Sequence, residues 1–162
     1  MGYYNSISEG YNELHKEEQL NKLKFIIPRI NKSKSLLDIG CGTGISTIKT
    51  INSVGIDPSK ELIKIAKSSY PKIKFLVREA ESLPFKNKSF YTVISVTAIQ
   101  NFKDIKKAIK EIERVAQKLI IITCLKKSKK LNKVSKILKD YKQKDIGIDI
   151  MFVKEIKSNQ QN

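Results

Sequence analysis

Leu36-Leu-Asp-Ile-Gly-Cys-Gly-Thr-Gly44 joins a short apolar run to three closely spaced glycines. Glycines there let the backbone turn tightly after a strand and pass close to a ligand. The amides that open a following helix suit a carboxylate or a phosphate. Val54-Gly-Ile-Asp57 then ends in an acid, near the spacing of about 20 residues at which an acid meets a ribose hydroxyl in dinucleotide-binding folds. The two segments together predict a site for an adenosine-bearing ligand.

Apolar strand patterns alternate with helical patterns along most of the chain. The expected strands cover residues 35–39, 53–57, 72–77, 90–96, 119–124 and 148–156, and the expected helices cover residues 3–30, 45–52, 59–69, 104–117 and 129–141. Strands joined through helices form parallel sheets with helices on both faces. The expected fold class is therefore α/β and Rossmann-like, with the ligand at the carboxyl ends of the strands.

Three parts are expected along the chain. Residues 1–30 form an N-terminal helical lid that Pro28 kinks or ends, residues 31–156 form the ligand-binding domain, and residues 157–162 form a flexible tail.

The composition is that of a globular chain with an unusual charge. Hydrophobic residues make up 40% of the 162 residues, which rules out a fully disordered chain. Thirty-two Lys and Arg face 16 Asp and Glu, for a net charge of +16. This charge indicates either a polyanionic partner, above all RNA, or a genome that favours lysine codons. Arg29, Arg78 and Arg114 are the only arginines, which favours the second interpretation in part, because nucleic-acid recognition often uses arginine.

Other features point to a reducing cytoplasm. No run approaches the roughly 18 apolar residues of a membrane helix, so no membrane contact is expected. The N-terminus lacks the pattern of a secretory signal. Cys41 and Cys124 cannot form a disulfide framework, and with one histidine they are too few for a usual zinc site, so no metal is expected.

The spacing of the glycines separates the possible cofactors. Gly40, Gly42 and Gly44 follow a G-x-G-x-G pattern, unlike the G-x-G-x-x-G of nicotinamide and flavin sites. Asp38 lies inside the strand before them, where an acid would repel a pyrophosphate but could fix an ammonium. S-adenosylmethionine carries an ammonium, a carboxylate and no phosphate, so it is the expected cofactor.

Several segments resemble the class I S-adenosylmethionine-dependent methyltransferases. Residues 37–44 resemble motif I, residues 54–57 resemble motif II, and residues 78–85 are similar to the family's G-D-A-x-x-L-P-F segment. Residues 88–95 and 98–104 resemble its S-F-D-x-V-x-S strand and A-L-H-H-x-x-D turn. Residues 4–11 resemble the opening of the type 11 branch, which includes quinone-biosynthesis and wobble-uridine tRNA methyltransferases. The resemblance implies a methyltransferase with the Rossmann-like class I fold.

The resemblance also implies roles for single residues. Asp38 would organise the methionine ammonium, Asp57 would bind the ribose, and Glu79 would meet the adenine amino group. The implied cofactor-binding residues are Asp38, Gly40, Gly42, Gly44, Asp57, Pro58, Glu79, Ala80 and Ser95.

The acceptor side departs from the family pattern. Tyr91 stands where the family has an acid, and Gln100 and Asn101 replace a histidine pair. The short region after the fifth strand predicts a C-terminally reduced fold without the extra strand hairpin of relatives. The sequence assigns no catalytic residue. Gln100 and Asn101 are the candidates for acceptor contacts, and Tyr11 would either close over the cofactor or only pack the first helix.

Two reactive side chains are expected to have ordinary roles. Cys124 follows a buried strand, so packing is favoured over a role as nucleophile. His15 is expected to be a solvated helix residue, although it lies on the lid segment.

The acceptor and the partners stay open at this point. The acceptor is RNA such as tRNA, bound through the basic surface, or a small molecule, and a third alternative is a non-catalytic subunit that binds S-adenosylmethionine. The lysines of residues 126–144 form a solvated helix face by default. The small size predicts a partner protein as platform, or self-association.

Overall fold

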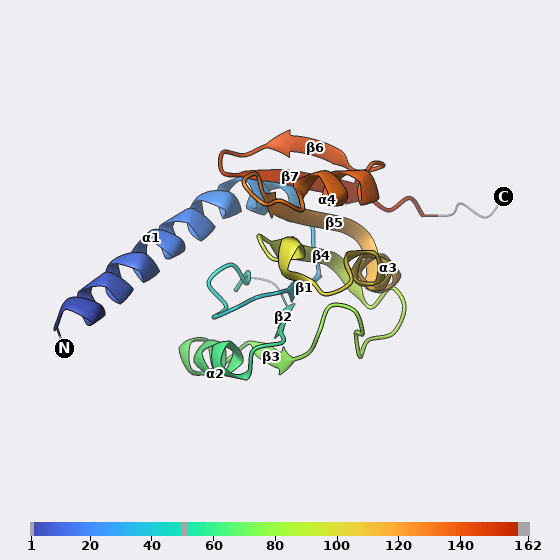
Figure 1. Ribbon diagram of the computed structural model, residues 1–162. Helices are drawn as coiled ribbons and strands as arrows, with labels where there is room; N and C mark the ends of the chain where they lie inside the picture. Colours follow the sequence, from blue (N-terminus) through green and yellow to red (C-terminus); the bar gives the residue numbers. More distant parts are fainter. Residues whose placement is uncertain (1, 50–51, 159–162) are drawn as a thin grey trace.

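One seven-stranded sheet forms the centre of the protein, in the order β3-β2-β1-β4-β5-β7-β6 (Figure 1). The computed structural model describes residues 2–49 and 52–158, with side chains from residue 13 onward. The strands are β1 (Ser35–Ile39), β2 (Asn52–Asp57), β3 (Lys74–Val77), β4 (Phe90–Val96), β5 (Ala116–Leu125), β6 (Lys142–Asp145) and β7 (Asp149–Glu155). Strands β1 to β5 pair in parallel, and β7 runs antiparallel to both β5 and β6. The expected mostly parallel sheet is confirmed.

The strand order reverses between β1 and β4, which are neighbours in the sheet. The connections from these two strands leave in opposite directions, so a crevice opens outside their carboxyl ends. The glycine loop follows β1 at this point, and residues 97–102 follow β4.

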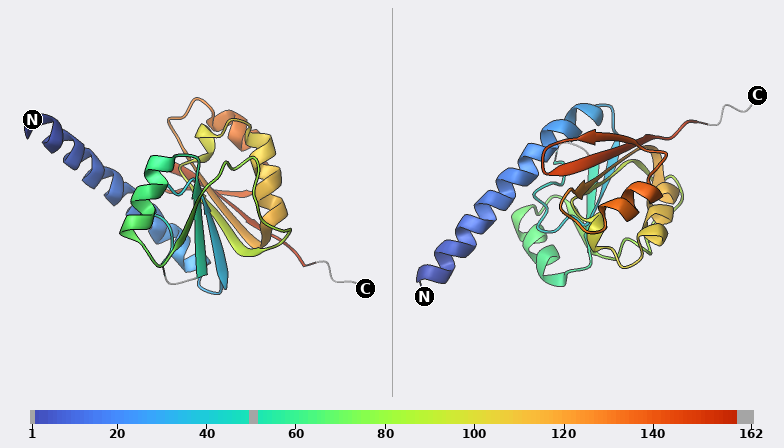
Figure 2. Two further views of the ribbon diagram at one scale, coloured as in Figure 1. Left: turned by 90° about the horizontal axis from the view of Figure 1, so that it is seen from below. Right: turned by 45° about the horizontal axis from the view of Figure 1, so that its top comes forward.

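Helices cover both faces of the sheet, as expected. They are α1 (Gly2–Ile26), α2 (Lys60–Ser69), α3 (Ile105–Val115) and α4 (Leu131–Ile137), with short 3-10 turns η1 (Ile27–Arg29) and η2 (Ile99–Asn101). Apolar residues of α3 and α4 share a core with Leu37 and Val93 on one face. The end of α1 packs with Leu36 and Ile94 on the other, and α2 lies on the α1 side while α3 lies opposite (Figure 2).

Side chains cap the starts of α2 and α3. Ser59 accepts a hydrogen bond from the Leu62 amide at the start of α2, and Asp104 accepts one from the Lys107 amide at the start of α3. Pro28 lies in η1, directly after α1 ends.

The helix expected over residues 45–52 is wrong for the part that the structure describes. Residues 45–49 form an irregular run of turns and bends. Ile, Ser and Thr are weak helix formers, and the Ser46 and Thr47 hydroxyls donate to Asp38. Lys49 donates to the carbonyl oxygens of Gly44 and Ile45. Side chains therefore satisfy polar groups that a helix would have satisfied through its backbone.

The expected loss of the C-terminal strand hairpin is also wrong. Helix α4 ends at Ile137, four residues before the predicted helix end, and β6 and β7 form an antiparallel hairpin at the sheet edge. All four residues of β6 are exposed and none is apolar, so the strand has no alternating pattern to detect. In addition, α3 ends at Val115 and β5 begins at Ala116, so the strand starts three residues before the expected residue 119.

None of the helices in residues 2–49 and 52–158 has the length and apolar character needed to cross a membrane. Lys157 and Ser158 have no regular structure, and the rest of the expected tail lies outside the described residues.

Candidate functional site

A cavity of about 380 Å³ lies at the carboxyl ends of β1, β2 and β4, within the range of small-molecule sites. The glycine loop and the end of β2 form one side of the cavity. Residues of α1 and of the segment after β4 form its other sides. The lining residues are His15, Gln19, Gly40, Cys41, Gly42, Thr43, Ile45, Ser46, Asp57, Pro58, Leu62, Val96, Thr97, Ala98, Asn101 and Phe102.

Two glycines shape the loop in different ways. Gly40 and Gly42 both have positive φ, at +73° and +54°. A Cβ on Gly40 would lie 2.4 Å from the Ala98 Cβ, so Gly40 lets the loop pack against the segment after β4. A Cβ on Gly42 would meet no protein atom within 4 Å. Because Gly42 lines the cavity, the space beside its backbone is available to a ligand.

Asp57 ties the glycine loop to the start of α2. Its Oδ2 accepts a hydrogen bond from the Gly42 amide at 3.0 Å, and its Oδ1 accepts one from the Ser59 amide at 2.9 Å. The carboxylate lines the cavity, and each oxygen keeps a second lone pair. Asp57 can therefore hold the loop and accept a ligand hydroxyl at the same time.

Asp38 is a fully buried acid under the loop. Its Oδ2 accepts hydrogen bonds from the Thr47 hydroxyl at 2.8 Å and the Ser46 hydroxyl at 3.4 Å, whereas its Oδ1 has no hydrogen-bond partner among the described residues. Burial raises the pKa of Asp38 from 3.8 to about 6. Asp38 does not line the cavity, but Ser46 does.

The raised pKa predicts that Asp38→Asn stabilises the ligand-free protein at neutral pH. A carboxyl whose pKa is higher in the folded state contributes stability below its unfolded pKa of 3.8 and loses it as pH rises through about 6. At pH 7.5 the charged form costs about 3 kcal/mol, so Asp38→Asn is expected to raise the melting temperature by several degrees.

Thermal unfolding at two pH values checks this. The difference between Asp38→Asn and wild type should shrink on going from pH 7.5 to pH 4, where Asp38 is protonated in the folded state and close to its midpoint of 3.8 in the unfolded state. A lower melting temperature of the variant at pH 7.5 would contradict the account.

A second, smaller cavity of about 70 Å³ shares Gly40, Pro58, Asn101 and Phe102 with the first. Glu79 and Ala80 line it. The Glu79 Oε1 lies 2.6 Å from the Lys103 Nζ, in an ion pair between exposed side chains. The two cavities together bring most of the predicted cofactor residues to one rim.

Some predicted residues lie elsewhere. Gly44 does not line either cavity, and its positive φ of +83° places it against Phe75 and Tyr70. Ser95 is fully buried in β4 and does not line the cavity. The three residues that follow it, 96–98, line the cavity instead. Gln100 donates to the Thr97 carbonyl oxygen and lines neither cavity, whereas Asn101 lines both. The Tyr11 side chain lies outside the described residues.

Cys124 and His15 differ in their exposure and in their relation to the cavity. Cys124 is buried, and burial raises the pKa of its thiol to about 11, which agrees with a packing role. His15 is exposed, as expected, but it also lines the cavity.

Sequence reasoning missed Gln19, Thr97 and Phe102 as lining residues. No local motif marks Gln19, because α1 reaches the cavity only through tertiary packing. Thr97 and Phe102 come soon after β4 ends at Val96, and a position just beyond the carboxyl end of a strand was the signal that could have marked them.

Comparison with known proteins agrees with this geometry. The sequence profile of a methyltransferase domain family matches residues 37–121. The chain belongs to this family. The match spans the glycine loop, Asp57 and most of β5, so it includes the cavity's loop side and the segment after β4.

Relatives and solved structures extend the comparison for this methyltransferase domain. The uncharacterized protein MJ1252 of Methanocaldococcus jannaschii is 39% identical over 115 residues, 70% of this chain and 45% of that protein. The demethylmenaquinone methyltransferase of Chlorobaculum tepidum is 35% identical over 89 residues, 52% of this chain and 37% of that enzyme. The chain therefore spans less than half the length of these relatives.

A solved structure shows the same fold. It is a SAM-dependent methyltransferase of Thermotoga maritima, described as a possible histamine N-methyltransferase. The TM-score is 0.74 at 18% identity, and the match covers 93% of this chain and 96% of that one.

Proposed function

We propose that this domain binds S-adenosylmethionine in the cavity beside Gly42 and transfers its methyl group to a small molecule. The observation that carries the proposal is the open space beside Gly42, next to the Asp57 carboxylate. Asp38 adds a second fit, because this buried acid lies directly behind the Ser46 hydroxyl, which lines the cavity, and a carboxylate there would favour an ammonium in the cavity.

The residues would share the cofactor as follows. Asp57 accepts the ribose hydroxyls while it holds the glycine loop, and Asp38, joined to the cavity by Ser46, favours the ammonium. Pro58 and Phe102 offer apolar surface for the adenine where the two cavities meet. Glu79 and Ala80 offer polar contacts there, and Gly40 and Gly44 shape the loop.

When bound, S-adenosylmethionine would supply a methyl group on a sulfonium: the acceptor atom would bond to the methyl carbon in line as the carbon–sulfur bond breaks, and S-adenosylhomocysteine would leave. The chain's own contribution is to hold the acceptor in the correct orientation beside the cofactor and to limit access of water. Residues that could orient an acceptor are Gln19 and His15 on α1 and Asn101 after β4. No residue is assigned as a base.

A small-molecule acceptor is supported by two observations. One relative acts on demethylmenaquinone by its name. Among the described residues, no lysine or arginine lines the main cavity, and Lys103 is the only one that lines the smaller cavity. The net charge of +16 therefore does not converge on the site, and it fits compositional bias better than RNA recognition there.

Transfer of labelled methyl from S-adenosylmethionine into an extract of the source cell tests the proposal. The extract is separated into small molecules, RNA and protein after the reaction. Label in the small-molecule fraction is expected. Label confined to RNA that falls steeply with salt would favour the RNA alternative, and label confined to protein would also contradict the proposal. Binding of S-adenosylmethionine with no transfer to any fraction would favour the non-catalytic subunit.

A further inference from the structure

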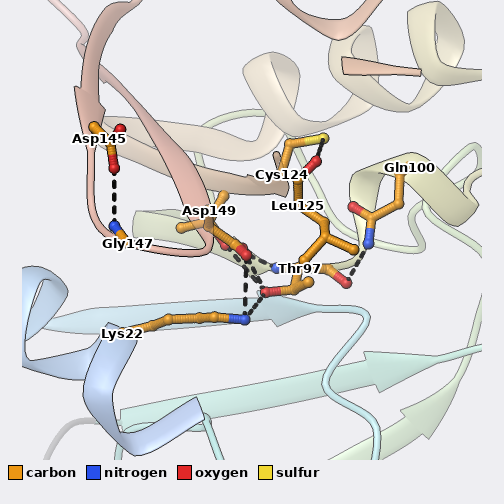
Figure 3. A network of polar contacts seen from close by, with 9 residues as sticks. Lys22, Thr97, Gln100, Cys124, Leu125, Asp145, Gly147 and Asp149 are labelled. Atoms are coloured by element: carbon orange, nitrogen blue, oxygen red, sulfur yellow. Dashed lines mark hydrogen bonds and ion pairs between the residues drawn. The ribbon is translucent and has the colours of Figure 1, made fainter. Parts of the chain in front are cut away.

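A buried polar cluster links α1 to Thr97, which follows β4, and to Asp149, the first residue of β7 (Figure 3). The Lys22 Nζ lies 3.3 Å from the Asp149 Oδ1, and the two side chains are 4% and 0% exposed. Lys22 donates to the Thr97 hydroxyl at 2.6 Å, and that hydroxyl donates to the Asp149 Oδ2 at 2.6 Å. Three segments far apart in the sequence therefore meet at Thr97.

Thr97 is held in an unusual conformation by this cluster. Its φ is +54°, in the left-handed region that β-branched residues rarely adopt. Its amide donates to the hydroxyl of the buried Thr123 at 2.8 Å. Such conformations persist only where surrounding contacts determine them, and they gather at functional sites.

The cluster stands directly behind the acceptor side of the cavity. Thr97 lines the cavity, and so does Gln19, one turn before Lys22 on α1. Lys22 is thus a cation one side chain away from the cavity, and Asp149 cancels its charge. Gln19, Thr97 and Asn101 offer neutral hydrogen-bonding groups on this side, next to the imidazole of His15.

We propose that Lys22, Thr97 and Asp149 form a charge-neutral wall that fits the cavity to an uncharged small-molecule acceptor. This inference rests on the proposed methyltransferase function. Thr97 contacts the ligand space, and Lys22 and Asp149 act through it as positioning residues. An acceptor with a carboxylate or phosphate would find no uncancelled positive charge in this wall, because Asp149 pairs with Lys22, whereas a neutral hydroxyl or ring would meet matching polar groups.

The electrostatic part is tested by the ratio of the dissociation constants of S-adenosylmethionine and S-adenosylhomocysteine, measured by calorimetry. The first ligand carries a sulfonium charge that the second lacks. Asp149→Asn leaves the Lys22 charge uncancelled and should raise the ratio roughly three- to tenfold. Lys22→Met leaves Asp149 uncancelled and should lower the ratio by a similar factor, and the double variant should return it to the wild-type value.

A purely structural role would change both affinities together and leave the ratio constant. Equal ratios in all four proteins would overturn the inference. The control is the half-exposed pair of Lys154 and Glu113, which is absent from the cavity lining: Lys154→Met should leave the ratio unchanged. Failure of the wild-type protein to bind either ligand would instead refute the proposed function.

The wild-type protein gives a second test that does not depend on the variants folding. The labelled small molecule from the extract is passed over anion- and cation-exchange resins at neutral pH. An uncharged product should pass through both resins. Retention on either one would overturn the inference while leaving methyl transfer intact.

Discussion

Gly42→Val is expected to lower the affinity for S-adenosylmethionine by more than about a hundredfold while the protein stays folded. The valine side chain would occupy the space in which the ligand is proposed to lie, because a Cβ there meets no protein atom. The positive φ of +54° adds backbone strain of about 1–3 kcal/mol, which should lower the melting temperature by only several degrees. Calorimetric titration and thermal unfolding of the variant measure the two effects.

Gly147→Val is a matched control for that variant. Gly147 also has positive φ, at +108°, and its Cβ would also meet no protein atom within 4 Å. It lies in the turn between β6 and β7, and it does not line the cavity. The control should lose stability and keep ligand affinity. If Gly42→Val binds as the control does, the ligand does not lie beside the glycine loop.

Asp57→Ala is expected to weaken binding of S-adenosylmethionine by roughly ten- to a hundredfold, since hydrogen bonds to a charged group contribute about 1.5–3 kcal/mol. The loss has two sources. The ribose would lose its acceptor, and the amides of Gly42 and Ser59 would lose theirs. The affinity is measured by titration of the variant and wild type under the same conditions.

Asp104→Ala is a control that removes a helix-capping acid without removing a residue of the cavity. Asp104 caps α3 as an exposed acceptor for the Lys107 amide, so its loss should cost about 1 kcal/mol of stability. It lines neither cavity and should leave affinity unchanged. Unaltered affinity in Asp57→Ala would mean that this acid serves only the fold.

The sequence allowed most of the fold to be predicted because the signals are local. The bounds of β1 and β4 follow from apolar runs flanked by polar or glycine residues, and the starts of α2 and α3 follow from capping residues. The strand β6 could not be found in this way, since an exposed edge strand needs only a pairing partner and no apolar side chains. The turns at residues 45–49 depend on hydroxyl donors that bond to a buried acid from another element.

The cavity residues also differ in whether a local sequence signal marks them. Gly40, Gly42 and Asp57 were predictable because motif and spacing lie within two adjacent strands. The opposite wall of the cavity could not be predicted, because Gln19 comes from α1, which is far from the glycine loop in sequence. The buried ion pair of Lys22 with Asp149 holds α1 in this place. Of the two residues predicted to contact the acceptor, Asn101 lines the cavity and Gln100 does not, because the Gln100 side chain donates to the Thr97 carbonyl oxygen.

Titration of S-adenosylmethionine into the wild-type protein tests the central claim most directly. One ligand per chain is expected to bind, with a dissociation constant in roughly the micromolar range and a melting temperature that rises with ligand concentration. Absence of binding heat and of any thermal shift, in protein that unfolds cooperatively, would contradict the account.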